Sequence, residues 1–392
     1  MNKQKILIVH NKYQIAGGED TVAENEGRLF EIHGHNVYYY IRTNKEIEGA
    51  SLLKKIYFGF SAFFSLRVYR DISNLIKRYD IDVVHVHNTV PIISCAVYYA
   101  AKKHQCILVQ SVHNQRMICP SGLMVRDNRI CEDCIHYGVS QAYKHKCYKN
   151  SWLYSFLMAE MISFNRKIGS YNKVDAFFVT TSFNLELLKN IVKKEKIYIK
   201  PYFTDIQPWK MNEKKRTYYI YISRVEYLKG IYVVLEAFKN LPEERLIVLG
   251  IGADRERACK YVEDNKLENI EFIEWKPKEE MLRLLYNAKA LVFPTQLYEG
   301  YPMTIVESMA VGTPVIGSNL GNVGTIIQNR YNGLLFQYNS SEDLREKIQY
   351  FSNHTEETYQ MEIGAQKYFK DNHTPDYVYE KTIKIYSGLQ KY

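Results

Sequence analysis

The chain has 392 residues, of which 46% are hydrophobic and 24% charged, and this composition excludes a disordered or fibrous protein. Its length predicts two domains. The net charge of +9 is unevenly placed: residues 1–200 contain 28 Lys and Arg against 17 Asp and Glu, whereas residues 201–392 contain 24 against 26. This asymmetry indicates an anionic partner for the first half. Nucleic acid is not favoured as that partner, because no recognition motif accompanies the charge.

The first residues, "MNKQKILIVHN", predict a strand, because their apolar run is too short for a secretory segment. No apolar stretch reaches the ~18 residues of a membrane-spanning helix. Seven cysteines without a signal peptide favour a reducing, cytoplasmic setting.

Short apolar runs alternate with helical patterns along the chain. "KILIVH" precedes a helix predicted from about Glu19 to Gly34, and "VVHVH", "ILVQSVH" and "AFFVTTS" follow in the first half. The second half contains "YYIYIS", "RLIVLG", "IEFIEW" and "ALVFPT". Continuous apolar strands between helices are typical of parallel sheets covered on both faces. The sequence therefore predicts two doubly wound α/β domains, with a linker in "YIKPYFTDIQPWKMNEKK".

Histidines stand at the carboxyl ends of two of these first-half strands. His113 ends "ILVQSVH", while His85 and His87 alternate with valines in "VVHVH". Ligands bind at the carboxyl ends of parallel strands, so His113 is a candidate for a cleft residue. The alternative for each of the three is a histidine that is satisfied within the core.

Two segments of the first half combine aromatic and basic residues. "SLLKKIYFGFSAFFSLRVYR" places apolar residues at helical spacing beside basic ones, and "YKHKCYKNSWLYSFLMAEMISF" repeats the mixture. The apolar positions are Leu53, Ile56, Phe60, Phe63 and Phe64, and the basic ones are Lys54, Lys55, Arg67 and Arg70. Such segments suit shallow insertion at an anionic membrane surface, and equally a core helix with a solvated face. Together with the charge asymmetry they favour a lipid-linked or membrane-proximal partner.

Four of the seven cysteines, Cys119, Cys131, Cys134 and Cys147, lie within 29 residues. The middle pair has the C-x2-C spacing that lets two thiolates hold one tetrahedral ion, which predicts a structural zinc site. Unlinked structural cysteines are the alternative, and disulfides are disfavoured in a reducing compartment. The substitute ligands are His113, His136 and His145.

In the second half, "YEGYPMTIVESMAVGTPV" places one carboxylate in a loop and another on the helix that follows. "ALVFPT" predicts a strand, Glu299 then lies in the loop, and the helix is expected to start near Pro302 and to carry Glu307. The backbone N–H groups near Tyr301 to Thr304 would form an anion-binding site. Carboxylates accept hydrogen bonds from a diol, so a sugar nucleotide would use all of these features. A structural helix with a solvated glutamate is the alternative.

Two cations follow another strand of the second half. In "YYIYISRVEYLKG", Arg224 and Lys229 lie in the loop between a strand and a helix. Both would emerge at the carboxyl end of that strand, where charge-assisted hydrogen bonds to a diphosphate could contribute ~1.5–3 kcal/mol each.

These motifs, with "GGED" near the start, resemble the retaining family-4 glycosyltransferases of the GT-B fold, over essentially the whole chain. The resemblance implies two Rossmann-like domains that face a central cleft. Residues 1–200 would form the acceptor side, with a Cys-rich insertion at about 119–147. Residues 201–370 would hold the nucleotide-sugar, and residues 371–392 would form a helix that returns to the first domain.

The resemblance also implies roles for individual residues. Glu299 would contact the transferred sugar, Glu307 the ribose hydroxyls, and His113 would be the cleft histidine. Arg224 and Lys229 would hold the diphosphate, and Gly17 and Gly18 would let their loop approach the donor. The residues expected to be catalytic are His113, Glu299, Arg224 and Lys229. Those expected to bind the donor are Gly17, Gly18, Arg224, Lys229, Glu299, Gly300, Tyr301, Pro302, Met303, Thr304 and Glu307.

The function implied is transfer of a hexose-like sugar, with retention, from a UDP- or GDP-sugar to a glycan or lipid-linked saccharide in bacterial surface polysaccharide synthesis. The enzyme would be cytoplasmic, or peripheral on the inner face of the membrane. The reaction builds negative charge on the leaving diphosphate, which cations and helix N–H groups stabilise, so no metal or cofactor is expected in the chemistry. The alternatives are a sugar-nucleotide epimerase with a soluble substrate and a non-catalytic sugar-nucleotide sensor.

Overall fold

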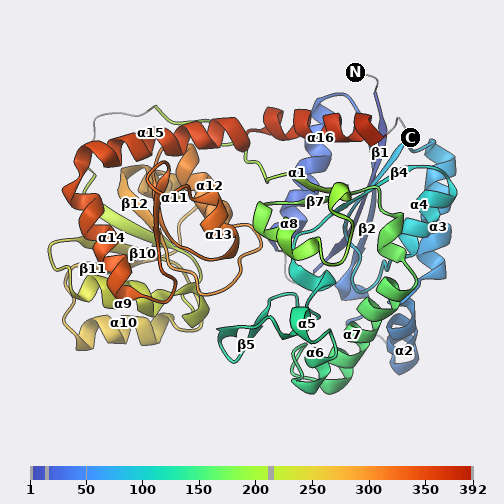
Figure 1. Cartoon of the computed structure of the whole chain (residues 1–392), viewed down its shortest axis with the longest axis horizontal. Coiled ribbons are helices and arrows are strands. Elements are labelled where there is room, and N and C mark those ends of the chain that lie inside the picture. The colour runs from blue at the N-terminus through green and yellow to red at the C-terminus, as the bar shows by residue number, and fades with distance from the viewer. Residues whose placement is uncertain (1–2, 14–16, 50, 211–215, 390–392) are drawn as a thin grey trace. The chain divides into compact units, whose positions relative to one another are not determined.

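The computed structural model describes residues 3–13, 17–49, 51–210 and 216–389, without the side chains of residues 52–56. The chain forms two compact units (Figure 1). The first consists of Met1–Met124, Glu132–Pro201 and Tyr379–Tyr392, and the second of Val125–Cys131 and Tyr202–Val378.

The first unit contains a six-stranded sheet of order β2-β1-β3-β4-β7-β8, in which every neighbouring pair is parallel. Its strands are β1 (Lys5–Lys12), β2 (Asn36–Thr43), β3 (Val83–Asn88), β4 (Ile107–Ser111), β7 (Ala176–Val179) and β8 (Ile197–Ile199). Its helices are α1 (Gly18–Ile32), α2 (Leu52–Ser61), α3 (Leu66–Tyr79), α4 (Ala96–Lys103), α5 (Asp133–His136), α6 (Gln141–Lys144), α7 (Trp152–Lys167) and α8 (Ser182–Leu188). Short 3₁₀ turns are η1 (Asn44–Glu46), η2 (Gln115–Met117), η3 (Ser170–Lys173) and η4 (Lys194–Lys196).

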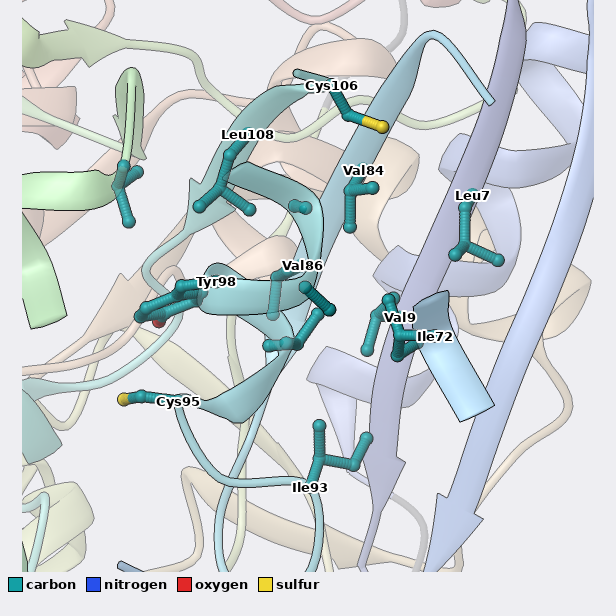
Figure 2. Close-up of a cluster of buried hydrophobic side chains, with 14 of the residues drawn as sticks. Leu7, Val9, Ile72, Val84, Val86, Ile93, Cys95, Tyr98, Cys106 and Leu108 are labelled. Atoms are coloured by element: carbon teal, nitrogen blue, oxygen red, sulfur yellow. The ribbon is translucent and has the colours of Figure 1, made fainter. Parts of the chain in front are cut away.

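Both faces of this sheet are buried, which explains the continuous apolar runs in the sequence. Leu7 and Val9 of β1 belong to the apolar cluster on one face, which Figure 2 shows with Val84, Val86 and Leu108. Ile6 and Ile8 alternate with them and belong to the cluster on the other face, because successive side chains of a strand point to opposite sides. The last helix, α16 (Pro375–Leu389), contributes Ile383 and Tyr386 to that second cluster.

The helical spacing expected across Phe60, Phe63 and Phe64 is wrong, because α2 ends at Ser61. The Ser65 hydroxyl accepts the N–H of Val68 and starts the next helix, α3. Phe64 packs edge-on against Tyr99, and Phe63 packs against a buried cluster of the first unit. Phe60 is 75% exposed, and the expected side chains at residues 53–56 lie outside the described part of the chain.

The second unit repeats the architecture with a six-stranded parallel sheet of order β11-β10-β9-β12-β13-β14. Its strands are β9 (Tyr218–Ile222), β10 (Arg245–Leu249), β11 (Ile270–Ile273), β12 (Ala288–Phe293), β13 (Val315–Ser318) and β14 (Gly333–Phe336). Its helices are α9 (Ile231–Lys239), α10 (Arg255–Asp264), α11 (Lys278–Asn287), α12 (Met303–Ala310), α13 (Gly321–Ile326), α14 (Ser341–Asn353) and α15 (Thr355–Asn372), with a 3₁₀ turn η5 (Tyr227–Lys229). The segment Val125–Cys131 forms a separate hairpin of β5 (Val125–Arg126) and β6 (Arg129–Ile130). The two doubly wound sheets confirm the expected fold class.

Candidate functional site

The sheet order of the second unit brings the two predicted motifs together. Strands β9 and β12 are neighbours, so the loops that follow them leave the same edge of the sheet side by side. Lys229 comes from the loop after β9 and Glu299 from the loop after β12. The Lys229 Nζ donates to both carboxylate oxygens of Glu299, at 2.7 and 2.9 Å. Their side chains are only 12% and 11% exposed, respectively, so the pair is a largely buried ion pair.

Gly230 makes this approach of the two loops feasible. Its φ is +76°, a conformation that L side chains rarely adopt. A Cβ atom there would lie 1.8 Å from the carbonyl oxygen of Pro294, which follows β12. Any residue other than glycine would therefore push the Lys229 loop away from the Glu299 loop.

The Glu299 loop is held by polar contacts on both sides. The Thr295 hydroxyl donates to Glu299 Oε1 at 2.8 Å. Asn322 Nδ2 donates to the carbonyl oxygens of Glu299 and Gly300, both at 2.6 Å. Sequence reasoning missed Asn322, although it lies in the first turn of α13, the helix that follows the apolar strand β13. These contacts fix the loop between β12 and α12.

The segments that carry Lys229 and Glu299 also contribute residues to a pocket of about 610 Å³. The expected donor residues Arg224, Met303, Thr304 and Glu307 line it, together with Trp275, Lys276, Pro277 and Lys278, among others. The last four were not predicted, although they directly follow the strand run "IEFIE". Trp275 is 55% exposed, which leaves its indole ring available to a ligand.

The two outer charges of the site are already paired. Glu307 Oε1 accepts from Lys278 Nζ at 3.0 Å, and its side chain is 12% exposed. Arg224 NH1 donates to Glu226 at 2.9 Å, and the Arg224 side chain is 64% exposed. Lys229 is thus a largely buried cation, whereas Arg224 is exposed.

Helix α12 starts at Met303 with Pro302 as the N-terminal flanking residue, as the sequence indicated. Met303 and Thr304 therefore present the first turn of a helix to the pocket, where N–H groups without an intrahelical acceptor favour an anion. The side chain of Tyr301 has a different place. It packs edge-on against Tyr202, and its burial raises the pKa of its hydroxyl well above the usual range.

In the first unit, His113 is buried and its Nε2 lies 3.0 Å from Nδ1 of His87. Both line a cavity of about 70 Å³ with Asn88, Asn114 and Arg116. Burial lowers the pKa of His113 well below its usual value, so the ring is neutral near pH 7. The structure places His113 at the carboxyl end of the sheet, in the loop after β4.

The loop of Gly17 and Gly18 lies close to the residue after His113. The Asn114 amide donates to Glu19 Oε1 at 2.7 Å. Gly17 precedes α1, and its N–H donates to Asp20 at 3.0 Å, so the helix begins at Gly18. No heavy atom of the described residues lies within 4 Å of a Cβ built on Gly18, outside its chain neighbours and its own helix backbone.

The Cys-rich segment shows one contact between two of its thiols. A hydrogen bond with Cys134 is the main cause that lowers the pKa of the buried Cys119 thiol to about 5, and Ser121 Oγ lies 3.1 Å from the Cys119 sulfur. Cys131 and Cys147 are partly buried. A thiolate is the form that binds metals, and the zinc site stays a prediction.

Comparison with known proteins identifies the family. Residues 16–207 match the family model described as Glycosyltransferase Family 4, and residues 203–368 match the model described as Glycosyl transferases group 1. The chain belongs to the family-4 glycosyltransferases of the GT-B fold. Within the described residues, no helix is long and apolar enough to cross a membrane.

Two relatives show what this family-4 chain is similar to. An uncharacterized glycosyltransferase of Methanocaldococcus jannaschii is 30% identical over 145 residues, which are 37% of this chain and 41% of that protein. The chain thus matches well under two thirds of the length of that relative. The N,N'-diacetylbacillosaminyl-diphospho-undecaprenol alpha-1,3-N-acetylgalactosaminyltransferase of Campylobacter jejuni is 23% identical over 305 residues, or 76% of each chain.

Solved structures of low sequence identity share the fold. The glycosyltransferase from Rickettsia africae has a TM-score of 0.70 at 18% identity and covers 100% of both chains. Anabaena HepE in complex with UDP has a TM-score of 0.68 at 13% identity, covering 98% of this chain and 100% of that one.

Proposed function

We propose that the chain is a retaining glycosyltransferase that moves a sugar from a UDP- or GDP-sugar to a glycan or lipid-linked saccharide in surface polysaccharide synthesis. The observation that carries the proposal is the buried Lys229–Glu299 pair, together with a 610 Å³ pocket of the same unit that Arg224 and Glu307 line. To bind a sugar nucleotide, a protein needs a pocket for the nucleoside, cations that pair with the diphosphate and a carboxylate that accepts hydrogen bonds from the sugar. The second unit offers all three at one sheet edge.

Each part of the donor has a partner in this arrangement. The nucleoside enters the pocket with its base against Trp275 and its ribose hydroxyls on Glu307, which accepts two hydrogen bonds. The diphosphate binds Lys229, Arg224 and the first turn of α12. Glu299 then faces the transferred sugar, held in place by Lys229 and Thr295.

The chemistry of the proposed transfer relies on preorganised charge. As the bond between the sugar and the phosphate breaks, negative charge develops on the leaving diphosphate, next to Lys229 and the helix N–H groups. Donors that are already oriented stabilise this charge without reorganisation. We therefore expect transfer to proceed without a divalent metal, and activity to survive EDTA in a short assay; complete loss on EDTA, restored by Mg²⁺ or Mn²⁺, would contradict this part.

The acceptor side is proposed from the first unit. Trp152, Leu153 and Tyr154 at the start of α7 are each at least 50% exposed, and Lys149 lies 5.5 Å from the ring of Tyr154. Exposed aromatic residues beside lysines suit the surface of an anionic membrane. The relative from Campylobacter jejuni carries a diphospho-undecaprenol in the name of its substrate, which supports a lipid-linked acceptor and a peripheral position on the inner membrane face.

Donor binding tests the proposal first. UDP- and GDP-sugars should be screened for thermal stabilisation, and those that stabilise should then be screened for slow hydrolysis. Glu299→Gln should keep nucleotide binding and lose hydrolysis, because a glutamine side chain retains the shape but not the charge. If no sugar nucleotide stabilises the chain, the proposal is wrong. An epimerised sugar nucleotide as the product would identify an epimerase, and binding without any turnover would identify a sensor.

The membrane part has its own test. Sedimentation with vesicles of anionic phospholipid should bring down the wild type, and Trp152→Ser with Leu153→Ser should reduce the bound fraction. The matched control is Tyr359→Ser, a substitution of a residue that is 49% exposed on α15 of the second unit. Equal sedimentation of all three proteins would contradict the assignment of this surface.

A further inference from the structure

The first unit contains a buried polar network behind His113. Glu26 of α1, His87 of β3 and Lys200, just after β8, are each 2% exposed. Lys200 Nζ donates to Glu26 Oε1, so the lysine and the glutamate form a fully buried ion pair. A buried ion pair is costly to desolvate. This pair is connected through His87 to His113, a candidate catalytic residue.

His87 connects the ion pair to His113. Its Nδ1 lies 3.0 Å from Nε2 of His113, and the two rings stack with an interplanar angle of 11°. On its other side, His87 Nε2 faces Glu26 Oε2 at 3.9 Å. Among the described residues, neither of these two facing atoms has a hydrogen-bond partner.

The hydrogen-bond partners of His87 and His113 determine which ring nitrogen of each carries the hydrogen. The Glu26 carboxylate, which is paired with Lys200, accepts hydrogen bonds, so the favourable arrangement places a hydrogen on His87 Nε2. His87 Nδ1 then carries a lone pair and accepts, and His113 Nε2 must donate. The opposite tautomer would bring two acceptors face to face in a dry interior, where an unfavourable polar contact is most costly.

The surroundings keep both imidazoles neutral. Each ring therefore carries a hydrogen on only one nitrogen, and the tautomer can be assigned. Burial is the main cause that lowers the pKa of His87 and of His113 well below the usual value. Lys200 and His10 act in the same direction on both rings, whereas Glu26 raises the pKa of His113. His85, stacked on His87, is neutral for the same reason.

A bound cation would not explain the network. Glu26, His85 and His87 offer three ligand atoms within 4.8 Å of one another. The ammonium group of Lys200 already supplies the positive charge beside Glu26. His85 hydrogen-bonds through both nitrogens, to Ser111 and to Tyr386, each at 2.8 Å.

We propose that Glu26 and His87 are positioning residues that hold His113 as the Nε2–H tautomer, so that its Nδ1 can only accept a hydrogen bond. Lys200 keeps the Glu26 carboxylate in place. This inference rests on the proposed function for the role of His113 in transfer, but the tautomer itself does not. Any group that hydrogen-bonds to His113 Nδ1 must therefore be a donor.

The tautomer can be read in the free protein. Nitrogen-15 NMR of histidine-labelled full-length protein at pH 7.5 should show His113 and His87 protonated at Nε2, with each signal assigned from its loss in His113→Asn and His87→Asn. A His113 ring protonated at Nδ1 would overturn the proposal. This readout needs no substrate, so it decides the inference even if the proposed transferase activity is not found.

The functional consequence is tested by a matched pair of substitutions at His87. Leucine and asparagine have similar size, but asparagine can place its Oδ1 near the former position of His87 Nδ1, where an amide oxygen accepts from His113 Nε2–H. His87→Leu should lower kcat for sugar-nucleotide hydrolysis roughly tenfold, with UDP affinity unchanged because the nucleotide binds the other unit. His87→Asn should retain most of kcat. Equal losses in the two variants would show that His87 only fills space, and would overturn its positioning role.

A double-mutant cycle tests Glu26. Glu26→Gln combined with Lys200→Met removes both buried charges together and avoids an unpaired ion. In the wild-type background this pair of substitutions should lower kcat roughly tenfold. In the His87→Asn background it should have no further effect on kcat, because the asparagine accepts without help from Glu26. Full additivity of the two losses would contradict the coupling.

Discussion

Lys229 and Glu299 form a bidentate contact between two adjacent loops, with the Lys229 ammonium 2.7 and 2.9 Å from the two Glu299 oxygens. The cation expected on the diphosphate and the carboxylate expected on the sugar are therefore one electrostatic unit. Removal of either member leaves the other largely buried and without its opposite charge. The effects of substitutions at the two positions should consequently be non-additive.

Lys229→Ala is expected to weaken UDP binding by about tenfold, the loss of one charge-assisted hydrogen bond. Isothermal titration calorimetry with UDP or GDP alone measures this loss without any sugar. The control is Lys260→Ala, which removes an exposed lysine of α10 outside the pocket. Unchanged nucleotide affinity in Lys229→Ala would remove the lysine from the diphosphate site.

Trp275 provides a direct signal for nucleotide binding. The chain has three tryptophans, Trp152, Trp209 and Trp275, and only Trp275 lines the 610 Å³ pocket. Stacking of a base on an indole is worth ~1–3 kcal/mol and quenches its emission. We expect UDP to quench part of the fluorescence of the wild type and none of the fluorescence of Trp275→Leu. Equal quenching in both proteins would place the base elsewhere.

His373 makes the second unit sensitive to acid. Burial lowers its pKa from 6.5 to about 4, although Nδ1 lies 2.9 Å from the carbonyl oxygen of Tyr202. Below pH 6.5, His373 binds a proton in the unfolded chain but stays neutral in the folded chain. The stabilising contribution is therefore complete above pH 6.5 and is lost as the pH falls toward 4, with about 2 kcal/mol lost by pH 5.

Urea unfolding at pH 7.5 and pH 5 measures this dependence. His373→Asn should be less stable at pH 7.5 and should show a smaller difference between the two pH values than the wild type. His354→Gln, at an exposed position at the end of α14, is the matched control and should leave the difference unchanged. A variant His373→Asn with the full wild-type difference would show that other groups cause the acid sensitivity.

The Cys-rich segment is expected to copurify with about one zinc ion per chain on the four-ligand hypothesis. Elemental analysis of reduced protein measures the ion, and Cys119→Ser or Cys134→Ser should lower both the zinc content and the melting temperature. Cys259→Ser, in α10 of the second unit, is the control and should change neither. Metal-free wild-type protein with four freely titratable thiols would rule the site out.

The fold was predictable because its strands are recognisable in the sequence. Parallel strands that are buried on both faces appear as continuous apolar runs, and their order in the chain gives the doubly wound arrangement. The candidate donor residues after β9 and β12 were selected for the same reason, since ligands bind at the carboxyl ends of such strands. Gly312 and Pro314 follow the end of α12 closely, as is typical of helix ends.

Partners that are distant in sequence were not predictable. Lys200 and Glu26 are separated by 174 positions, and nothing local to either residue indicates that the two charges meet in the interior. The break between α2 and α3 was missed because the aromatic residues continue across it and only Ser65 marks the new helix. Lys278 was missed because a lysine at the start of a helix is usually a solvated charge, whereas here α11 packs against α12 and Lys278 reaches Glu307.

The contact between Lys278 and Glu307 changes how a ligand would arrive at the pocket. Lys278 Nζ already occupies a Glu307 oxygen at 3.0 Å, although the lysine side chain is 55% exposed. In the proposed function, ribose hydroxyls would therefore meet a carboxylate that already carries a cation. An ammonium released from Glu307 would add to the positive charge of Arg224, which lines the same pocket. Binding of the ribose and release of the Lys278 ammonium would then be coupled. A nucleoside without phosphates offers no anion to the released lysine, so it should bind much more weakly than the nucleoside diphosphate.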